Sequence, residues 1–146
     1  MQTFLPFSDF KTSLYCLDDR RLGKQRLEAD QAIQILSGNG KLTKNGKVAY
    51  ANHPTCLQWA GFLDSLKLYF NLTVKLWVAK GYNNNYSLFE LPKTIIHPPW
   101  LGYEPYHSSH RASLLFKKYE HYSQFGWAET PKIEYFWPSK DFKKEI

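Results

Sequence analysis

The stretch Asp-Asp-Arg-Arg-Leu-Gly-Lys-Gln-Arg-Leu-Glu, residues 18–28, opens the helix on which the predicted fold depends. We expect this helix to span residues 19–37 and to end at the Ser-Gly-Asn-Gly run that begins at residue 37. Apolar residues recur at helical spacing in its second half and define a core face: Ala29, Ala32, Ile33, Ile35 and Leu36. Followed back toward the N-terminus, the same rows become mostly polar. One row carries Arg21, Gln25 and Glu28, and the other carries Leu22 and Arg26.

This polar half of the helix has two interpretations. In the first, it is a solvated surface on which Glu28 pairs with Lys24, four residues earlier. In the second, it is the wall of a site, because buried charge needs partners or a water-filled cleft. The arginines would then hold phosphates, and the carboxylate would carry out acid–base chemistry.

The composition favours a protein that binds a polyanion. The 146 residues carry a net charge of +6, and 17% of them are aromatic. Such a composition is typical of surfaces that bind phosphates and stack on bases, although a small protein with a bulky core has it too. The length fits one domain over residues 1–146.

Features of the chain predict a cytoplasmic monomer without a membrane span. The start, Met-Gln-Thr-Phe-Leu-Pro, lacks the pattern of a signal peptide. The apolar stretch at 57–79 is interrupted by Asp64, Lys67 and Lys75, which argues against membrane insertion. Cys16 and Cys56 match no metal spacing, so we expect free thiols, with a single disulfide as the alternative.

Two further helices are predicted, at residues 54–80 and 109–123. Pro54 fits a first helical position and Gly81 a position just beyond the end. The apolar stripe of the second helix requires a central place: Leu63, Leu66, Phe70, Val74 and Trp77. In the third helix, four residues are expected to face inward: Ala112, Leu115, Phe116 and Tyr119.

The intervening segments complete the predicted architecture. Residues 1–17 are expected to form a short extended arm, and residues 82–107 a long connector. Residues 38–52 form a flexible connector or a basic finger that carries Lys41, Lys44 and Lys47. The predicted fold class is therefore all-α, a single compact three-helix domain with long loops.

The starts of the second and third predicted helices are polar. Asn52 and His53 precede one, and the run Tyr-His-Ser-Ser-His-Arg at 106–111 opens the other. Helix N-termini attract phosphate, although His53 and His110 also fit a capping or surface role. His53, His107 and His110 match no known zinc pattern, and we expect neither a metal nor a cofactor.

Several motifs together resemble one family. They are Leu-Gly-Lys-Gln-Arg-Leu-Glu at 22–28, His-Pro-Thr-Cys-Leu at 53–57, Tyr-His-Ser-Ser-His-Arg-Ala-Ser-Leu-Leu at 106–115, and the aromatic tail. Over nearly its whole length the chain resembles the pyrimidine-dimer DNA glycosylases, in a bacterial and phage branch. The resemblance implies an all-α three-helix fold and a glycosylase with lyase activity. It also implies that the N-terminal α-amine attacks the sugar C1′, that a glutamate assists, and that arginines hold the DNA backbone.

The chain departs from the family pattern at two places. The family glutamate directly follows an arginine, whereas Leu27 separates Arg26 from Glu28. Either the helix register slips by one residue, or Glu28 is not the equivalent acid. The family nucleophile is a threonine exposed by removal of the initiator methionine. Here the bulky Gln2 follows Met1, so the free amine is expected on Met1, with Thr3 displaced inward.

An α-amine is a suitable nucleophile on physical grounds alone. Its pKa is about 7.8, against about 10.4 for lysine, so its neutral fraction at pH 7 is about 400 times larger. A nearby arginine would lower its pKa further, and Glu28 could transfer protons at the sugar. The target base must leave the stack, where aromatic residues can hold it or fill its place.

We therefore predict a DNA glycosylase, with lyase activity through an N-terminal imine, that acts on damaged or modified bases in duplex DNA. Two alternatives are an enzyme on the same scaffold for a modified nucleotide or hypermodified base, and a non-catalytic nucleic-acid-binding module. The predicted catalytic residues are Met1, Glu28 and Arg26. The predicted DNA-binding residues are Thr3, Arg20, Arg21, Lys24, Gln25, Asn52, His53, His107, His110, Arg111 and Lys117. One cleft is expected to collect the Met1 amine, Arg21, Arg26, Glu28, His53 and His110.

Overall fold

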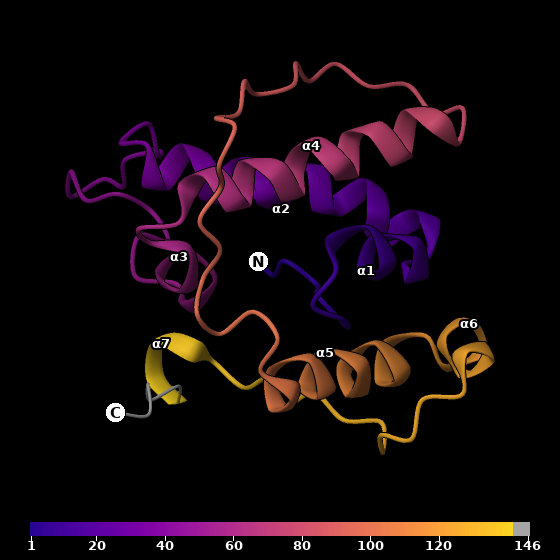
Figure 1. Cartoon of the computed structure of the whole chain (residues 1–146). Coiled ribbons are helices and arrows are strands. Elements are labelled where there is room, and N and C mark those ends of the chain that lie inside the picture. The colour runs from indigo at the N-terminus through magenta and orange to yellow at the C-terminus, as the bar shows by residue number, and fades with distance from the viewer. Residues whose placement is uncertain (142–146) are drawn as a thin grey trace. The chain divides into compact units, whose positions relative to one another are not determined.

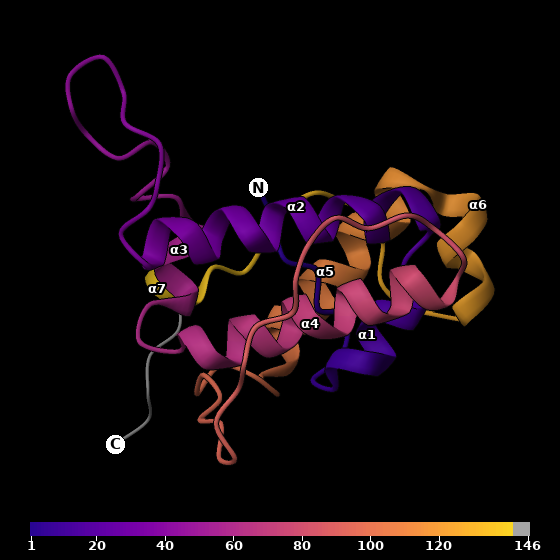
Figure 2. The ribbon, with the colours of Figure 1, turned by 90° about the horizontal axis from the view of Figure 1, so that it is seen from above.

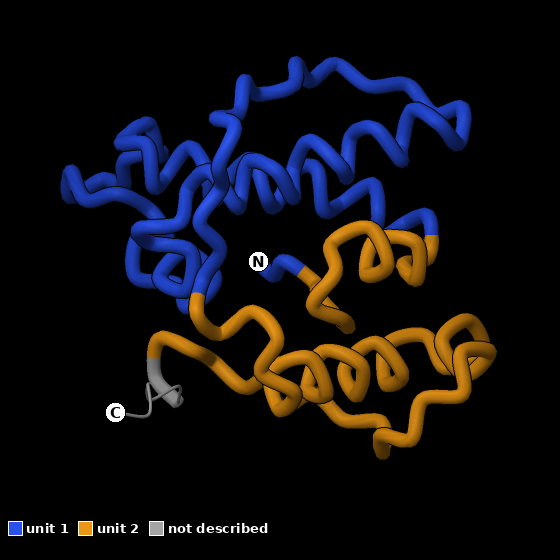
Figure 3. The backbone as a smooth tube through the Cα atoms, in the orientation of Figure 1, with its two compact units in different colours: residues 1–3, 19–98 blue, residues 4–18, 99–146 orange. Residues whose placement is uncertain are grey.

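The computed structural model describes the backbone of residues 1–141 and the side chains up to residue 139. The last five residues of the expected domain therefore lie outside the described part. Figure 1 shows a chain built of helices, and within the described residues the only β pairing is an isolated bridge between Leu42 and Val48. The all-α class is thus confirmed. The contacts divide the chain into unit 1, residues 1–3 and 19–98, and unit 2, residues 4–18 and 99–146 (Figure 3).

Unit 1 is organised by two long helices. Helix α2 (Asp19–Leu36) packs along α4 (Leu63–Ala79), and both Figure 1 and Figure 2 show the two side by side. The shorter α3 (Pro54–Trp59) contacts both. The predicted position of α2 is confirmed to within one residue at its end.

The α2–α4 contact depends on a glycine. A Cβ atom added at Gly23 would lie 2.8 Å from the Trp77 ring, which is closer than real Cβ atoms approach. The helices therefore approach closely at this turn of α2. Around it, the buried core of unit 1 contains apolar residues from all three helices: Leu22, Ala29, Ala32, Ile33, Trp59, Leu66, Phe70 and Val74.

The helix predicted at 54–80 is in fact two helices. Both of its predicted ends are correct, since Pro54 lies in the first turn after the cap at His53, and Gly81 has φ +93° beyond the cap at Lys80. Gly61, however, adopts φ +85°, a left-handed conformation that ends α3 and turns the chain into α4. The prediction of one continuous helix was wrong because the apolar pattern continues across this glycine.

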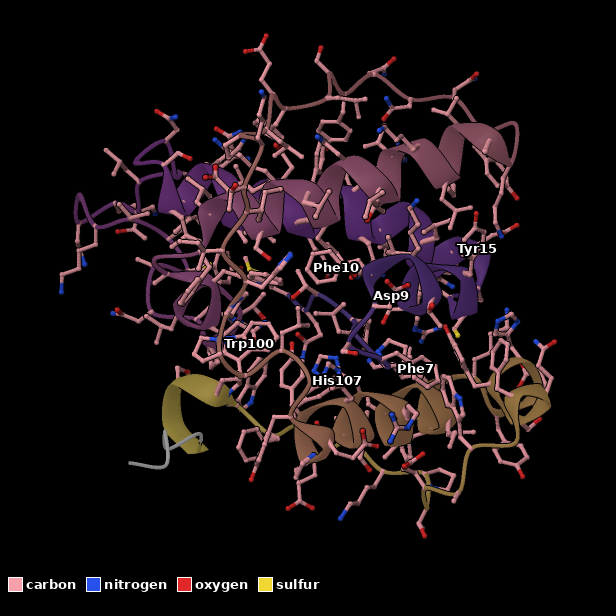
Figure 4. The ribbon with its side chains drawn as sticks, in the orientation of Figure 1. Phe7, Asp9, Phe10, Tyr15, Trp100 and His107 are labelled. Atoms are coloured by element: carbon pink, nitrogen blue, oxygen red, sulfur yellow. The ribbon has the colours of Figure 1, made fainter. Side chains whose placement is uncertain are left out.

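Unit 2 contains α1 (Phe10–Cys16), α5 (Glu104–Lys117), α6 (Tyr119–Tyr122), the 3₁₀ helix η1 (Ser123–Phe125) and α7 (Pro138–Asp141). Helix α1 replaces the second half of the arm predicted at 1–17. Asp9, labelled in Figure 4, caps it by accepting hydrogen bonds from the Thr12 backbone N–H at 2.8 Å and from its hydroxyl at 2.7 Å. Phe10 and Leu14, one turn apart, are buried.

Helix α5 begins five residues earlier than predicted. Its first turn contains Pro105, so Ser108 and Ser109, next to the predicted start, lie inside the helix. It ends at Lys117, because Lys118 leaves the helical region with φ −153°. Phe116 and Tyr119, which were predicted to face inward, are each 59% exposed. Ala112 and Leu115 are buried as predicted. The helix predicted at 109–123 is thus two helices whose buried face keeps only half of the predicted residues.

The connector that follows α4 is held to unit 1 by side chains of that helix. The Asn71 amide donates to the Phe89 carbonyl at 2.8 Å and accepts from the Phe89 N–H at 2.9 Å. The Ser65 hydroxyl lies 2.7 Å from the His97 Nδ1 atom. Among the described helices, none combines the length and the apolar character needed to cross a membrane.

Gly23→Ala provides a test of the close α2–α4 approach. In an exposed helix this change stabilises by about 1 kcal/mol. Here we expect urea unfolding to report a loss of about 1–3 kcal/mol, because the new methyl group overlaps the Trp77 ring. In a Trp77→Leu background, Gly23→Ala should cost less stability than it does in the wild-type background. A Gly23→Ala protein more stable than wild type would contradict the packing described.

Candidate active site

The first three residues, here called the N-terminal segment (Met1–Thr3), are fixed within unit 1. The Thr3 hydroxyl oxygen accepts from the Trp59 indole N–H at 3.0 Å and from the Gln58 amide at 3.2 Å. The Thr55 hydroxyl donates to the Met1 carbonyl at 3.0 Å. Thr3 is fully buried and Gln2 nearly so. The segment therefore cannot be a free arm, and the α-amine has a defined position.

The Met1 α-amine lies beside Glu28. Its nitrogen is 3.9 Å from Glu28 Oε1, and the Met1 side chain is 3% exposed against 29% for that of Glu28. Burial raises the pKa of Glu28 above its ordinary value, while the N-terminal ammonium group and Lys24 act in the opposite direction. An amine and a half-buried carboxylate with a raised pKa are the two groups that amine attack and proton transfer require.

Glu28 is oriented by a buried amide. Gln25 donates through Nε2 to Glu28 Oε2 at 3.0 Å and to the Gln2 carbonyl at 3.1 Å. Its Oε1 accepts from the Tyr69 hydroxyl at 2.7 Å, which fixes the orientation of the amide. Gln25 is 1% exposed, so its three hydrogen bonds are internal. The structure thus gives Gln25 a positioning role for both the carboxylate and the N-terminal segment.

His53 belongs to the same site through Thr55. Its Nδ1 accepts from the Thr55 backbone N–H at 3.1 Å as the cap of α3. The proton of the neutral ring is therefore on Nε2, which makes that atom a donor. Burial, and then the nearby N-terminal ammonium group, lower the pKa of His53, so the ring is neutral at pH 7.

Arg26 has other contacts. Its guanidinium lies 4.5 Å from the centroid of the Trp77 ring, and Nη1 donates to Asn84 Oδ1 at 3.1 Å. Residues two apart on a helix project about 200° apart, so Arg26 and Glu28 lie on different faces of α2. The structure therefore does not bring Arg26 together with the Met1 amine and Glu28, but places it in the α2–α4 contact.

The remaining predicted residues of unit 1 line its surface. Arg20, Lys24 and Asn52 are exposed, and Arg21 is partly exposed. Lys24 is close enough to Glu28 to affect the pKa of that carboxylate, as the four-residue spacing predicted. Arg20 and Lys24 thus lie on an exposed face of α2, whereas Gln25 and Glu28 lie beside the N-terminal segment.

A comparison with family models identifies the chain's relatives. The model described as pyrimidine dimer DNA glycosylase matches residues 1–90, which is more than half of the 146 residues and includes Met1, Glu28 and His53. The chain belongs to the pyrimidine dimer DNA glycosylase family. Membership makes base removal the general class of reaction and DNA the substrate, and it confirms the resemblance noted in the sequence. No curated protein and no solved structure matches the chain.

Two histidines predicted to bind DNA lie in unit 2 of this family member, on α5. His107, labelled in Figure 4, faces the Leu5 carbonyl at 2.7 Å through Nδ1 and accepts from the Gly102 N–H at 2.9 Å through Nε2. The Nδ1 of His110 accepts from the Leu5 N–H at 2.9 Å. His110 is fully buried, and burial, with His107 and Arg111, lowers its pKa to about 3. Both rings thus hold the chain at Leu5.

Arg111 is neutralised within unit 2. It donates to Glu129 at 3.0 and 3.1 Å, to the Pro6 carbonyl at 2.7 Å, and forms an ion pair with Glu104. With its side chain 9% exposed and its charge matched by two carboxylates, it has little left to offer a phosphate. Lys117, by contrast, is exposed in the last turn of α5.

Most of the contacts that support the amine could not be predicted from the sequence. Gln25 lies three residues before Glu28, so helical spacing alone indicated that the two could interact. Nothing in the sequence indicated that Thr55 and Trp59 would bind the segment, or that Tyr69 would bind Gln25, because those contacts join distant parts of the chain. Cys16 and Cys56 are free and buried, and within the described residues no group of His, Cys, Asp and Glu is arranged to hold a metal.

The Glu129–Arg111 pair gives unit 2 a pH-dependent stability. Burial alone would raise the pKa of Glu129, but hydrogen bonds from Arg111 and Ser108 outweigh it, and the pKa is lowered. A lowered pKa stabilises the fold above the unfolded value of about 4.3, and that contribution disappears as the pH falls through the folded value. We expect Glu129→Gln to cost about 3 kcal/mol at pH 7, because it leaves a buried charge with one partner fewer.

The loss should be smaller at pH 3 than at pH 7, because pH 3 lies below the unfolded value and proton uptake by the unfolded wild-type chain removes part of the contribution of the pair. Thermal unfolding at both pH values measures this. Glu104→Gln is the control, and should cost less at pH 7 because the Glu104 side chain is 71% exposed. An equal loss for Glu129→Gln at pH 7 and pH 3 would contradict the assignment.

Proposed function

We propose that this protein removes damaged pyrimidines from duplex DNA and cleaves the resulting abasic site, with the Met1 α-amine as nucleophile and Glu28 as the acid–base group. The observation that carries the proposal is the 3.9 Å approach of the two groups in the structure. Family membership supports the glycosylase part. The lyase part rests on the amine, because only a nucleophile that bonds to C1′ leaves an imine.

The reaction can be written with this chain's own groups. The neutral Met1 nitrogen bonds to C1′ as the bond between C1′ and the base breaks, and the base leaves with a proton. Opening of the sugar ring then converts the new C1′–N bond into a protonated imine. Loss of a proton from C2′ expels the 3′ phosphate, and water releases the amine.

Glu28 has a specific part in these steps. A carboxylate near a phosphate backbone opposes DNA binding by Coulomb repulsion, so its presence beside the amine needs another reason. Its raised pKa brings it closer to neutral pH, where a group can both accept and return a proton. It can take the proton of the attacking amine and protonate the sugar oxygen as the ring opens.

The segment itself supports attack by the amine. Thr3, Gln2 and the Met1 carbonyl are held by hydrogen bonds from α2 and α3, so the amine has lost its conformational freedom before substrate binds. A nucleophile fixed in advance avoids the entropic cost of ordering it in the transition state.

Borohydride trapping tests the proposal. Incubation with a duplex that carries a pyrimidine dimer, in the presence of sodium borohydride, should give a covalent protein–DNA adduct because the imine is reduced to a stable amine. Peptide mass analysis should place the DNA on the peptide that contains Met1. An adduct on a lysine would overturn the assignment of the nucleophile, and excision without any adduct would indicate a purely hydrolytic glycosylase.

Replacing Glu28 separates catalysis from binding. We expect Glu28→Gln to lower single-turnover excision by about 10²–10⁴-fold while leaving DNA affinity nearly unchanged. Glu90→Gln, at an exposed position of the connector in unit 1, is the matched control and should behave as wild type. Melting temperatures of the same preparations exclude unfolding as the cause. If Glu28→Gln excised at the wild-type rate, Glu28 would have no part in the mechanism.

A further inference from the structure

The 38–52 loop carries positive charge that the protein does not neutralise. Lys41, Lys44 and Lys47 are all exposed. Between Asp30 and Asp64 the sequence contains no aspartate or glutamate. In the part of the chain that the structure describes, none of the three ammonium groups forms an ion pair. Their charge is therefore available to a partner outside the chain.

Backbone hydrogen bonds order these lysines on a hairpin, residues 41–49. The Thr43 N–H donates to the Lys47 carbonyl at 2.7 Å, and the Ala49 N–H donates to the Lys41 carbonyl at 2.8 Å. At the tip, the Gly46 N–H donates to the Thr43 carbonyl at 2.9 Å, and Gly46 has φ +76°, as the left-handed position of a three-residue hairpin loop requires. Of the two interpretations open from the sequence, these bonds favour the basic finger over the flexible connector.

The base of the hairpin packs closely against α2. A Cβ atom added at Gly40 would lie 2.6 Å from Val48 Cγ1 and 3.1 Å from Ile35 Cγ1. A glycine at this position therefore lets the chain pass between the two side chains as it leaves the helix. Figure 2 shows the loop projecting beyond the C-terminal end of α2. The hairpin thus has a defined direction relative to the helix that carries Glu28.

The hairpin and the amine site lie at different places along the same helix. Glu28 precedes the last residue of α2, Leu36, by about 12 Å at the helical rise of about 1.5 Å per residue. Phosphates of one DNA strand follow each other at about 3.4 Å along the duplex axis. A phosphate at the hairpin is therefore about three to four base pairs, or more, from the attacked nucleotide.

We propose that the hairpin is a second DNA contact, which binds phosphates of the duplex backbone through Lys44 and Lys47 at a distance from the damaged nucleotide. Lysine binds phosphate as a point charge, and phosphate contacts position a protein without reading the sequence. Lys41 lines a cavity of about 400 Å³ together with Asp30, so the two lysines nearer the tip carry the contact. The position of the damaged nucleotide rests on the proposed function, whereas DNA as partner follows from the family.

The salt dependence of binding to an undamaged duplex tests the contact. Each lysine–phosphate contact adds about 0.9 to the slope of the logarithm of the binding constant against the logarithm of the salt concentration. We therefore expect the double variant Lys44→Gln with Lys47→Gln to lose about 1.8 from this slope. Its melting temperature should equal that of wild type, because both side chains are exposed.

A second double variant, Lys75→Gln with Lys93→Gln, is the matched control. It removes the same charge from two exposed positions of unit 1 outside the hairpin, and should keep the wild-type slope. Exposed lysines also protect the edge of a hairpin from pairing with other chains, a role that needs no nucleic acid. A wild-type slope for the hairpin variant, or an equal loss in the control, would overturn the inference.

Shortened substrates test the distance between the two contacts. The reference is a duplex with a pyrimidine dimer and about one helical turn of DNA, roughly 10 base pairs, on each side. With limiting enzyme, the hairpin variant should excise more slowly than wild type on this duplex. Shortening the flank that the hairpin reaches to about two base pairs, about 7 Å of duplex, should abolish the difference, and shortening the other flank should leave it.

Saturating enzyme separates this contact from the chemistry. Wild type and the hairpin variant should then excise at the same rate, because the contact adds affinity and takes no part in bond breaking. A difference with limiting enzyme that survives shortening of either flank would overturn the inference. A wild type that excises no dimer would overturn the proposed function, while the salt slopes would still decide whether the hairpin binds DNA.

Discussion

The site depends on the hydrogen bonds that the Thr3 hydroxyl accepts. Its oxygen accepts from both Trp59 and Gln58, so its acceptor capacity is used within the protein, and Thr3 is fully buried. This anchors the chain two residues from its amino end. Thr55 binds the Met1 carbonyl, and Gln25 binds the Gln2 carbonyl. These hydrogen bonds fix the α-amine beside Glu28. A terminus that is normally frayed becomes an ordered functional group.

The buried charged groups of this chain have two kinds of surroundings. Arg111 is matched by two carboxylates and a carbonyl, which neutralises a buried charge and stabilises unit 2. Glu28 accepts from the Gln25 amide and lies beside the Met1 amine, and burial raises its pKa. The first arrangement favours one ionisation state, as a structural pair should. The second allows the state to change, as acid–base chemistry requires. The same reasoning separates His110, neutral and fully buried, from His53, neutral and half-buried beside the amine.

The sequence predicted the parts of the site that local spacing determines. The polar rows of the first helix pointed to Glu28; the family resemblance pointed to an α-amine, and the Gln2 after Met1 placed that amine on Met1. Arg26 was grouped with them because it is close in sequence, but helical geometry turns it toward Trp77. His110 was expected in the same cleft, and His107 and Arg111 were expected to bind DNA. No local pattern indicated the contacts with Leu5 and Glu129 in which these side chains are buried. Gly61 divided a predicted helix because its left-handed backbone interrupts an apolar pattern that otherwise continues.

We propose that the fixed position of the Met1 amine makes it the nucleophile. A protein extended by a single glycine before Met1 keeps every side chain but moves the amine by about 3.5 Å. Borohydride trapping on an abasic duplex, followed over time for both proteins, measures the consequence. We expect the extended protein to bind the duplex as wild type does and to form essentially no adduct. Adduct formation at the wild-type rate by the extended protein would contradict it.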